Sequence, residues 1–208
     1  RPAGDRRRRP QAFALLPSRA DALGIRVFSG GVVSDAIGRS RVKGARIVDA
    51  SGGVHSISCD LLVVSGGFSP NVQITTHLGG RSQWRDDIAA FVPGTMPKNL
   101  AAAGAANGSF SLASCLAEGA RTGSAAAASA GFDAKPIAVP SSDDEPSSVA
   151  AFWHVEGAKH KAFVDFQNDV TAADVALAER EGYRSVEHLK RYTTLGMATD
   201  QGRTSGVN

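Results

Sequence analysis

The sequence contains little cysteine and no long apolar run, and both shortages exclude classes of protein. Its 208 residues include 2 cysteines, Cys59 and Cys115, which lie far apart without the spacing of a metal-binding motif. Such a pair is too sparse for a disulfide framework and fits a reducing compartment, where each cysteine behaves as a small apolar residue. The least polar stretches, 101–106 and 124–131, are alanine and glycine and fall far short of a membrane span. We therefore expect a cytoplasmic protein with no membrane contact.

Positive charge is concentrated at the start of the sequence. The formal net charge is +3, and much of the excess comes from Arg6–Arg9, between Pro2 and Pro10. A run this short, with no aromatic platform beside it, is more typical of a solvated arm than of a nucleic-acid-binding face. We therefore expect no nucleic-acid partner. Residue 1 is Arg and no Gly-x-Gly-x-x-Gly turn precedes Ile25, so we expect the chain to begin within a larger protein, with residues 1–23 as a divergent or disordered start.

The stretch 59–71 is the most informative part of the chain. Leu61–Val64 is apolar, too short for a helix, and bounded by Asp60 and by the pair Gly66-Gly67. This pattern predicts a strand buried on both faces, as in a parallel sheet covered by helices. Ligands of open α/β sheets bind beyond the carboxyl ends of strands, where the two glycines let the backbone approach closely. Many α/β proteins contain such a turn without a nucleotide site, so the pattern alone leaves both interpretations open.

The segments around this stretch predict small elements that act as scaffold. Gly52-Gly53 is typical of a hairpin turn, and an isolated histidine such as His77 is more often structural than catalytic. We expect Arg85, Asp86 and Asp87 to lie in a solvated loop, because carboxylates that act as acid and base require burial. The expected elements are a helix at 18–23, strands at 25–28, 32–33, 41–49 and 54–58, a helix at 72–80, a loop at 84–91, a strand and turn at 100–108, and a helix at 111–130.

Two strings of residues resemble the pyridine-nucleotide/flavin disulfide-reductase-like domains. The first is Asp60-Leu-Leu-Val-Val-Ser-Gly-Gly-Phe-Ser-Pro-Asn71, and the second is Ala117-Glu-Gly-Ala-Arg-Thr-Gly123, on a helix rich in small residues. The resemblance implies the distal part of a two-dinucleotide-binding α/β domain over residues 24–132. The residues that it implies near a dinucleotide are Gly66, Gly67, Asn71 and Gly104.

One departure from this family bears on the cofactor. The family has a Gly-Asp pair whose aspartate accepts hydrogen bonds from the flavin, whereas here Gly104 is followed by Ala105. This departure argues against FAD at the site. A nucleotide held by backbone groups and by the N-terminus of the 111–130 helix is still compatible with the sequence, and Asn107 would supply a weaker polar contact.

A Pro-, Ser- and acid-rich linker, 133–150, separates this part from a terminal module, 151–208. Thr171 predicts the cap of a first helix, with Asp174 at the capping-box position, and Ser185 predicts the cap of a second. The layout resembles bacterioferritin-associated ferredoxins. The positions that match their four cysteines are Asp165, Gln167, Asp200 and Ser205. Iron–sulfur clusters need thiolate ligands, so we expect a helical module without a cluster and without a metal.

The combination of these two parts resembles the α subunit of heterotetrameric sarcosine oxidases. The resemblance is strongest at Ala162-Phe-Val-Asp-Phe-Gln-Asn-Asp-Val-Thr171 and in the run from Glu181 to Ser205, which includes Leu195-Gly-Met-Ala-Thr-Asp-Gln-Gly-Arg-Thr204. It implies a subunit that binds NAD beside partner subunits β, γ and δ, in a complex that also carries FAD and FMN. It further implies oxidation of sarcosine to glycine with formation of H2O2 and transfer of the one-carbon unit to tetrahydrofolate.

The expected role of this chain within such a complex is limited. The phosphate-binding Gly-x-Gly-x-x-Gly half and a folate domain are not in the sequence, so we expect no independent catalysis and no catalytic residue here. Two alternatives remain open. One is a non-catalytic assembly module in which Lys190, Arg191 and Tyr192 form an interface, although the two basic residues are equally well explained as a solvated helix face. The other is an electron-transfer subunit of a related amine dehydrogenase.

Overall fold

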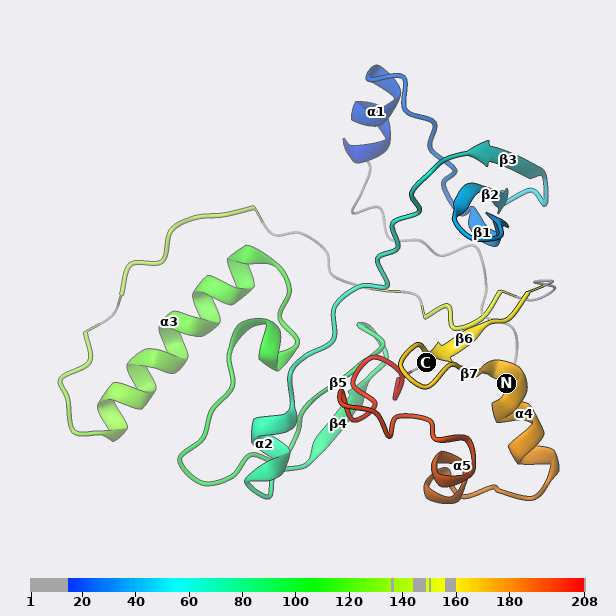
Figure 1. Cartoon of the computed structure of the whole chain (residues 1–208). Helices are drawn as coiled ribbons and strands as arrows, with labels where there is room; N and C mark the ends of the chain where they lie inside the picture. Colours follow the sequence, from blue (N-terminus) through cyan, green and yellow to red (C-terminus); the bar gives the residue numbers. More distant parts are fainter. Residues whose placement is uncertain (1–14, 136, 144–148, 150, 156–159, 208) are drawn as a thin grey trace. The chain divides into compact units, whose positions relative to one another are not determined.

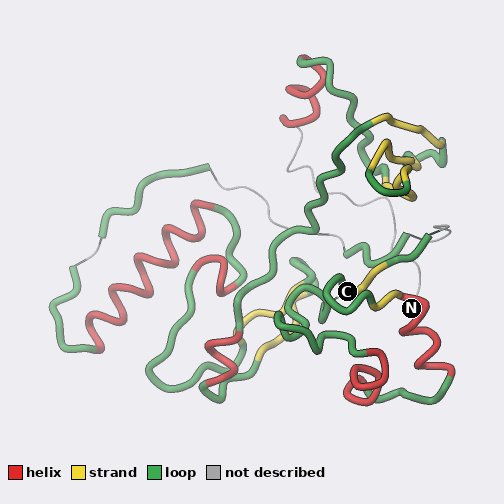
Figure 2. Tube along the Cα trace, in the orientation of Figure 1, coloured by secondary structure: helices red, strands yellow, loops and turns green. Residues whose placement is uncertain are grey.

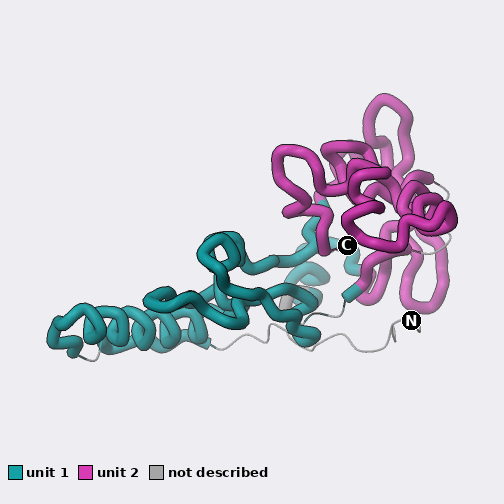
Figure 3. The backbone as a smooth tube through the Cα atoms, turned by 90° about the horizontal axis from the view of Figure 1, so that it is seen from below, with its two compact units in different colours: residues 1–27, 64–151 teal, residues 28–63, 152–208 magenta. Residues whose placement is uncertain are grey.

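The computed structural model describes residues 15–135, 137–143, 149, 151–155 and 160–207. The chain divides into two compact units, shown in two colours in Figure 3. The first comprises Arg1–Val27 and Val64–Ala151, and the second comprises Phe28–Val63 and Phe152–Asn208. Mixed helices and small antiparallel sheets make up both units (Figure 1). The boundaries expected from the sequence at residues 24, 133 and 151 stay predictions.

The second unit contains the antiparallel sheet expected from the sequence. Strands β1 (Val32–Gly38), β2 (Val42–Val48) and β3 (Val54–Ser58) are arranged in the order β1-β2-β3. The pairs Val48↔Val54 and Ile47↔His55 fix the β2–β3 register. The predicted strand at Ile25–Phe28 is wrong, because this segment is extended but pairs with no strand of the described chain.

Asp49 closes the β2–β3 turn, together with Gly52 at a φ of +90°. Asp49 Oδ1 accepts hydrogen bonds from the backbone N–H groups of Ser51 at 2.9 Å and Gly53 at 2.8 Å, and Oδ2 lies 2.6 Å from His55 Nε2. The Ser51 hydroxyl, the His55 ring and the Gly53 N–H favour the charged carboxylate and lower its pKa well below the ordinary value. The Gly52-Gly53 turn is therefore stabilised by the charged Asp49 carboxylate as well as by its backbone conformation.

The first unit consists of short elements around one long helix. Its parts are α1 (Leu15–Ala22), α2 (Gln73–His77), β4 (Ser82–Arg85), β5 (Ala90–Pro93), a 3₁₀ turn η2 (Gly104–Asn107) and α3 (Leu112–Ser129). The Ser111 hydroxyl caps α3 by accepting a hydrogen bond from Ser114 N at 3.2 Å. Instead of the expected loop, residues 84–91 form most of the β4–β5 hairpin. The charges nevertheless lie in its turn, where Arg85 pairs with Asp87.

The strand expected at Leu61–Val64 does not form, and this is the main correction to the sequence-based fold. The segment is drawn as loop in Figure 2, and Leu61, Val63 and Val64 are 71%, 80% and 80% exposed. A strand that is buried on both faces needs hydrogen-bonded neighbours on both sides. The described residues contain no strand that pairs with this segment, so it stays a loop whose apolar side chains are exposed to solvent. The strand expected just before Gly104 is absent for the same reason.

A small apolar core holds the β4–β5 hairpin in the first unit. Ile88, Ala90 and Val92 are buried against one another, and Phe110 packs against them. Gly108, with a φ of +83°, lies on this core as the residue that ends the η2 turn. The core therefore ties the turn before α3 to the hairpin. Within the described part of the chain, no helix is both long and apolar enough to cross a membrane.

The terminal module forms the helices that its capping residues predict. Strands β6 (Phe163–Asp165) and β7 (Val170–Thr171) precede α4 (Ala172–Arg180) and α5 (Val186–Thr193). Thr171 and Asp174 form the complete capping box at the start of α4: the Thr171 hydroxyl accepts from Asp174 N, and Asp174 Oδ2 accepts from Thr171 N at 2.8 Å. Ala178, on α4, is fully buried.

Asp165 is the residue that holds the two ends of this module together. Its side chain is buried, with the residue 1% exposed, and Oδ1 accepts hydrogen bonds from Gln167 N at 2.8 Å and Asn168 N at 3.2 Å. Oδ2 accepts from Gly196 N at 2.8 Å, 31 residues further along the chain. The Gly196 bond above all lowers the pKa of Asp165, against a smaller opposing effect of burial. One buried negative charge thus links the loop after β6 to the loop after α5.

Two glycine-to-alanine substitutions in the first unit test its packing. A Cβ on Gly108 would lie 2.6 Å from Val92 Cγ1 and 3.0 Å from Ile88 Cδ1. Gly108→Ala should therefore lower the free energy of unfolding by about 1–3 kcal/mol through strain and overpacking. Gly119→Ala, on the exposed side of α3 with nothing within 4 Å, should raise it by up to about 1 kcal/mol. Urea titrations of both variants measure the free energy of unfolding. A change of the same sign in both variants would contradict the packing described.

Asp165→Asn tests the buried charge. The amide has no charge and turns an NH₂ group toward backbone donors, so the variant should melt several degrees below the parent at neutral pH. Because the folded pKa of Asp165 lies below its unfolded value of about 3.9, the stabilisation is complete above about pH 4 and is lost as the pH falls through the folded pKa. The gap in melting temperature should therefore close in acid. Asp169→Asn, an exposed change in the same turn, is the matched control and should show little effect at any pH.

Candidate functional site

The Gly66-Gly67 turn is open on the side where a ligand was expected. Among the described residues, apart from the immediate chain neighbours, no atom lies within 4 Å of a Cβ built on either glycine. Gly67 has a φ of +101°, which disfavours other side chains. Asn71, which closes the same string, is exposed just before α2. The turn therefore has free space above its backbone, and none of that space is filled by the described part of the chain.

The structure brings Gly104 and Asn107 together through Glu118. Glu118, on α3, accepts a hydrogen bond from Gly104 N at 2.9 Å through Oε2 and one from Asn107 Nδ2 at 2.5 Å through Oε1. The η2 turn and α3 lie side by side in Figure 1, so a side chain from one turn of the helix reaches the loop. Because the N–H of Gly104 is bonded to Glu118, it is not free to bind a phosphate. The prediction that Gly104 lies near a dinucleotide stays a prediction.

The electrostatics of this arrangement favour an ionised Glu118. Its side chain is 13% exposed, and burial alone would raise its pKa. Hydrogen bonds from Asn107, Ser109 and Gly104, together with the charge of Arg121 at 3.9 Å, outweigh burial and lower the pKa of Glu118. At neutral pH the carboxylate is therefore charged and acts only as an acceptor.

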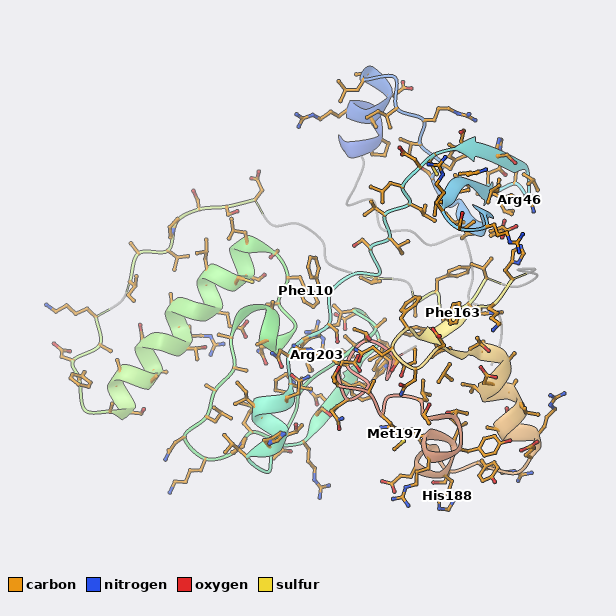
Figure 4. All side chains as sticks on the ribbon, viewed as in Figure 1. Arg46, Phe110, Phe163, His188, Met197 and Arg203 are labelled. Atoms are coloured by element: carbon orange, nitrogen blue, oxygen red, sulfur yellow. The ribbon has the colours of Figure 1, made fainter. Side chains whose placement is uncertain are left out.

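A ring contact relates the Gly66-Gly67 turn to the η2 turn. Phe68 follows the glycines and Phe110 follows Asn107, and the centroids of these two rings are 6.1 Å apart at an interplanar angle of 32°. Phe110, labelled in Figure 4, also packs on the hairpin core. Phe68, from the first of the two sequence strings, thus contacts Phe110, which lies between the η2 turn and α3 in the same unit of the fold.

Glu118 is the site residue that sequence reasoning did not assign. The sequence pattern includes Glu118 only as one residue of the string Ala117–Gly123 and predicts no separate role for its side chain. A signal was present: Glu118 is the only acidic residue between Ser111 and Ser129, on a helix made mostly of alanine, glycine and serine. An isolated carboxylate on such a helix either faces solvent or binds a partner in the fold, and here it binds the preceding loop.

The four positions that match ferredoxin cysteines carry oxygen groups that already have partners, apart from Ser205. The carboxylate of Asp165 is occupied as described above, Gln167 Oε1 accepts from Thr199 Oγ1 at 2.8 Å, and Asp200 Oδ2 accepts from Thr204 Oγ1 at 2.6 Å. Ser205 is 2% exposed, and its Oγ has no hydrogen-bond partner among the described residues. These neutral and carboxylate oxygens do not fit an iron–sulfur cluster, which requires thiolates. Among the described residues no group of three His, Cys, Asp or Glu side chains could hold a metal ion.

The three residues considered for an interface do not behave alike. Arg191 is exposed and lies 3.9 Å from Glu187 on the same helix, which is the solvated pair expected of a surface. Tyr192 instead stacks on Tyr183, with ring centroids 4.3 Å apart and an interplanar angle of 20°. Lys190 is half-buried beside Gly196. Tyr192 and Lys190 therefore help to pack α5, and only Arg191 is free of packing.

Comparisons with known proteins find one family model that matches the end of the chain and relatives that match most of its length. The family model described as "Sarcosine oxidase A3 domain" matches residues 159–208. Sarcosine oxidase subunit alpha of Rhizobium meliloti (strain 1021) is 44% identical over 174 residues, which cover 80% of this chain and 18% of that protein.

Two further relatives extend the match. Sarcosine oxidase subunit alpha of Corynebacterium sp. (strain P-1) is 36% identical over 204 residues, or 91% of this chain and 21% of that protein. The protein of the same name from Corynebacterium sp. (strain U-96) is 39% identical over 211 residues, which cover 95% of this chain and 22% of that protein. The chain thus spans about a fifth of the length of these curated relatives. Over most of its length, the chain is a homologue of one part of sarcosine oxidase subunit alpha.

Proposed function

We propose that this chain is the part of a sarcosine oxidase α subunit that contributes the distal half of an NAD site and the cluster-free helical module beside it. The proposed complex, with β, γ and δ subunits that carry FAD and FMN, oxidises sarcosine to glycine, forms H2O2 and passes the one-carbon unit to tetrahydrofolate. The family relationship supports this role, because the relatives are named as subunits of that enzyme. Catalysis itself would take place on groups outside this chain.

The observation that carries the NAD proposal is the open face above Gly66. Its backbone is unobstructed within 4 Å, and the Phe68–Phe110 contact relates it to the Asn107 turn. These residues would hold the dinucleotide from one side. The phosphate-binding half of the site would come from another part of the subunit, and its strands would supply the neighbours that Leu61–Val64 lacks. NAD would supply hydride-transfer chemistry or act only as a structural ligand.

A second candidate function is assembly without a nucleotide. Phe163 and Phe166 in the terminal module are 40% and 75% exposed, and their ring centroids are 6.2 Å apart. Exposed aromatic pairs of this kind are favoured at protein–protein interfaces. This observation supports a contact surface on the module, and such a surface is compatible with NAD binding in the first unit.

The substitution Gly66→Val tests the NAD proposal. Because a Cβ at this position meets no atom of the described residues within 4 Å, apart from its chain neighbours, the variant should fold and assemble normally. Its isopropyl group would occupy the space of a bound dinucleotide. The full α subunit is expressed with its partners, and the nucleotide released on denaturation is quantified by chromatography. We expect stoichiometric NAD from the parent complex and far less from Gly66→Val.

The control for this test is Gly123→Ala on α3, where a Cβ also meets nothing within 4 Å. It should keep its NAD. If the parent complex releases no NAD, the proposal is wrong; if the parent releases NAD but Gly66→Val retains all of it, the turn is not part of the site. Complexes that assemble fully without NAD would favour the assembly function.

A further inference from the structure

We propose that Glu118 is a positioning residue of the nucleotide site: it holds the Asn107 carboxamide with Oδ1 outward, as an acceptor for a sugar hydroxyl of the bound dinucleotide. This inference rests on the proposed function, and it deepens that function by naming the group on this chain that recognises the ligand. It also assigns a role to a residue whose sequence position gave it none.

The orientation of the carboxamide follows from hydrogen-bond chemistry. An ionised carboxylate has no proton to donate, so only the Nδ2 group of Asn107 can face Glu118 Oε1, at 2.5 Å. The low pKa of Glu118 agrees with an ionised group. Asn107 Oδ1 must then point away from Glu118. Asn107 is half-buried, and the hydrogen bond of its side chain among the described residues is the one through Nδ2, which leaves Oδ1 available to a ligand.

The backbone on which Asn107 sits is fixed by the same carboxylate. Glu118 Oε2 accepts from Gly104 N at 2.9 Å, and Gly104 has a φ of +65°. Gly108 ends the turn at a φ of +83°, packed on Val92. With both ends of the turn held, the Asn107 carboxamide has little freedom to rotate or to exchange its oxygen and nitrogen. A rigid acceptor loses less conformational entropy when it binds a ligand.

The chemistry of the Asn107 Oδ1 atom favours a sugar hydroxyl over a phosphate oxygen. Oδ1 is an acceptor, and a phosphate oxygen is an acceptor too, so the two do not form a hydrogen bond. The Gly104 N–H that could have bound a phosphate is already used by Glu118. A hydroxyl donates, and both the ribose of NAD and the ribityl chain of FAD provide one. Arg121, 3.9 Å from Glu118, offsets part of the carboxylate charge that would otherwise repel a dinucleotide.

The arrangement also explains how the site tolerates the missing aspartate after Gly104. The reductase-like families place an acceptor at residue 105, where this chain has Ala105. Here the acceptor oxygen comes from Asn107, two residues later. An aspartate would not need to be oriented, because its two oxygens are equivalent, whereas the Asn107 amide is oriented by Glu118. An amide without such a partner could present either its oxygen or its nitrogen.

The test compares NAD with its 2′-deoxy and 3′-deoxyribose analogues on the full complex after its nucleotide has been removed. The parent should bind at least one deoxy analogue about tenfold more weakly than NAD, the loss expected for one hydrogen bond to a ligand hydroxyl. Asn107→Leu and Glu118→Gln should bind NAD about tenfold more weakly and should no longer distinguish it from that analogue. Glu187→Gln, a surface carboxylate paired with Arg191, is the matched control and should behave as the parent.

The outcomes separate the two proposals. If Glu118→Gln weakens NAD and its analogues equally while discrimination is retained, Glu118 is only structural and the inference is overturned. If the parent binds NAD without discriminating against either analogue, no ribose hydroxyl is read and the inference is also overturned. If the untreated parent releases no NAD, but its total FAD content falls in Asn107→Leu and Glu118→Gln and not in Glu187→Gln, the cofactor of the proposed function is wrong and the positioning role stands. A parent that releases no NAD, with an FAD content that is the same in all three variants, contradicts both proposals.

Discussion

The loops of this chain depend on one kind of interaction: a carboxylate that accepts hydrogen bonds from backbone N–H groups. Asp165 joins two loops of the terminal module in this way, Glu118 fixes the turn before α3, and Asp49 closes a hairpin. Each bond is charge-assisted and therefore stronger than a bond between neutral groups. The described elements are short and bury few side chains, so the apolar core alone leaves these loops without fixed positions. The carboxylates supply that order locally.

Asp165 shows how one buried charge can serve as the centre of a small module. In the ferredoxin-like pattern four thiolates around a cluster would hold together the chain segments that contain residues 165–167 and 200–205. Here the backbone donors of Gln167, Asn168 and Gly196 converge on one buried carboxylate instead. The module keeps its capped helices because these depend on Thr171, Asp174 and Tyr183–Tyr192 packing, none of which requires a metal.

Local signals predicted the elements whose partners are close in sequence. The Gly52-Gly53 turn, the Ser111 cap and the Thr171–Asp174 box act within a few residues, and the β2–β3 hairpin, α3 and α4 formed as expected. The strands at Ile25–Phe28 and Leu61–Val64 did not form, because strand formation depends on neighbours that no local pattern specifies. Glu118 was missed for a related reason: its bond to Gly104 spans 14 residues, and a spacing of that length has no sequence signature.

The central claim is that carboxylates within the chain order its own loops. The proposal for Leu61–Val64 is that this segment becomes a strand only when the rest of a larger subunit supplies its neighbours. Amide hydrogen exchange, measured on the 208-residue chain and on the full complex, tests both parts at once. We predict slow exchange of the Gly104 and Gly196 amides in both samples, and rapid exchange of the Leu61–Val64 amides that becomes slow only in the complex. Equally rapid exchange of Leu61–Val64 in both samples, or unprotected Gly104 and Gly196 amides in the chain alone, would contradict the account.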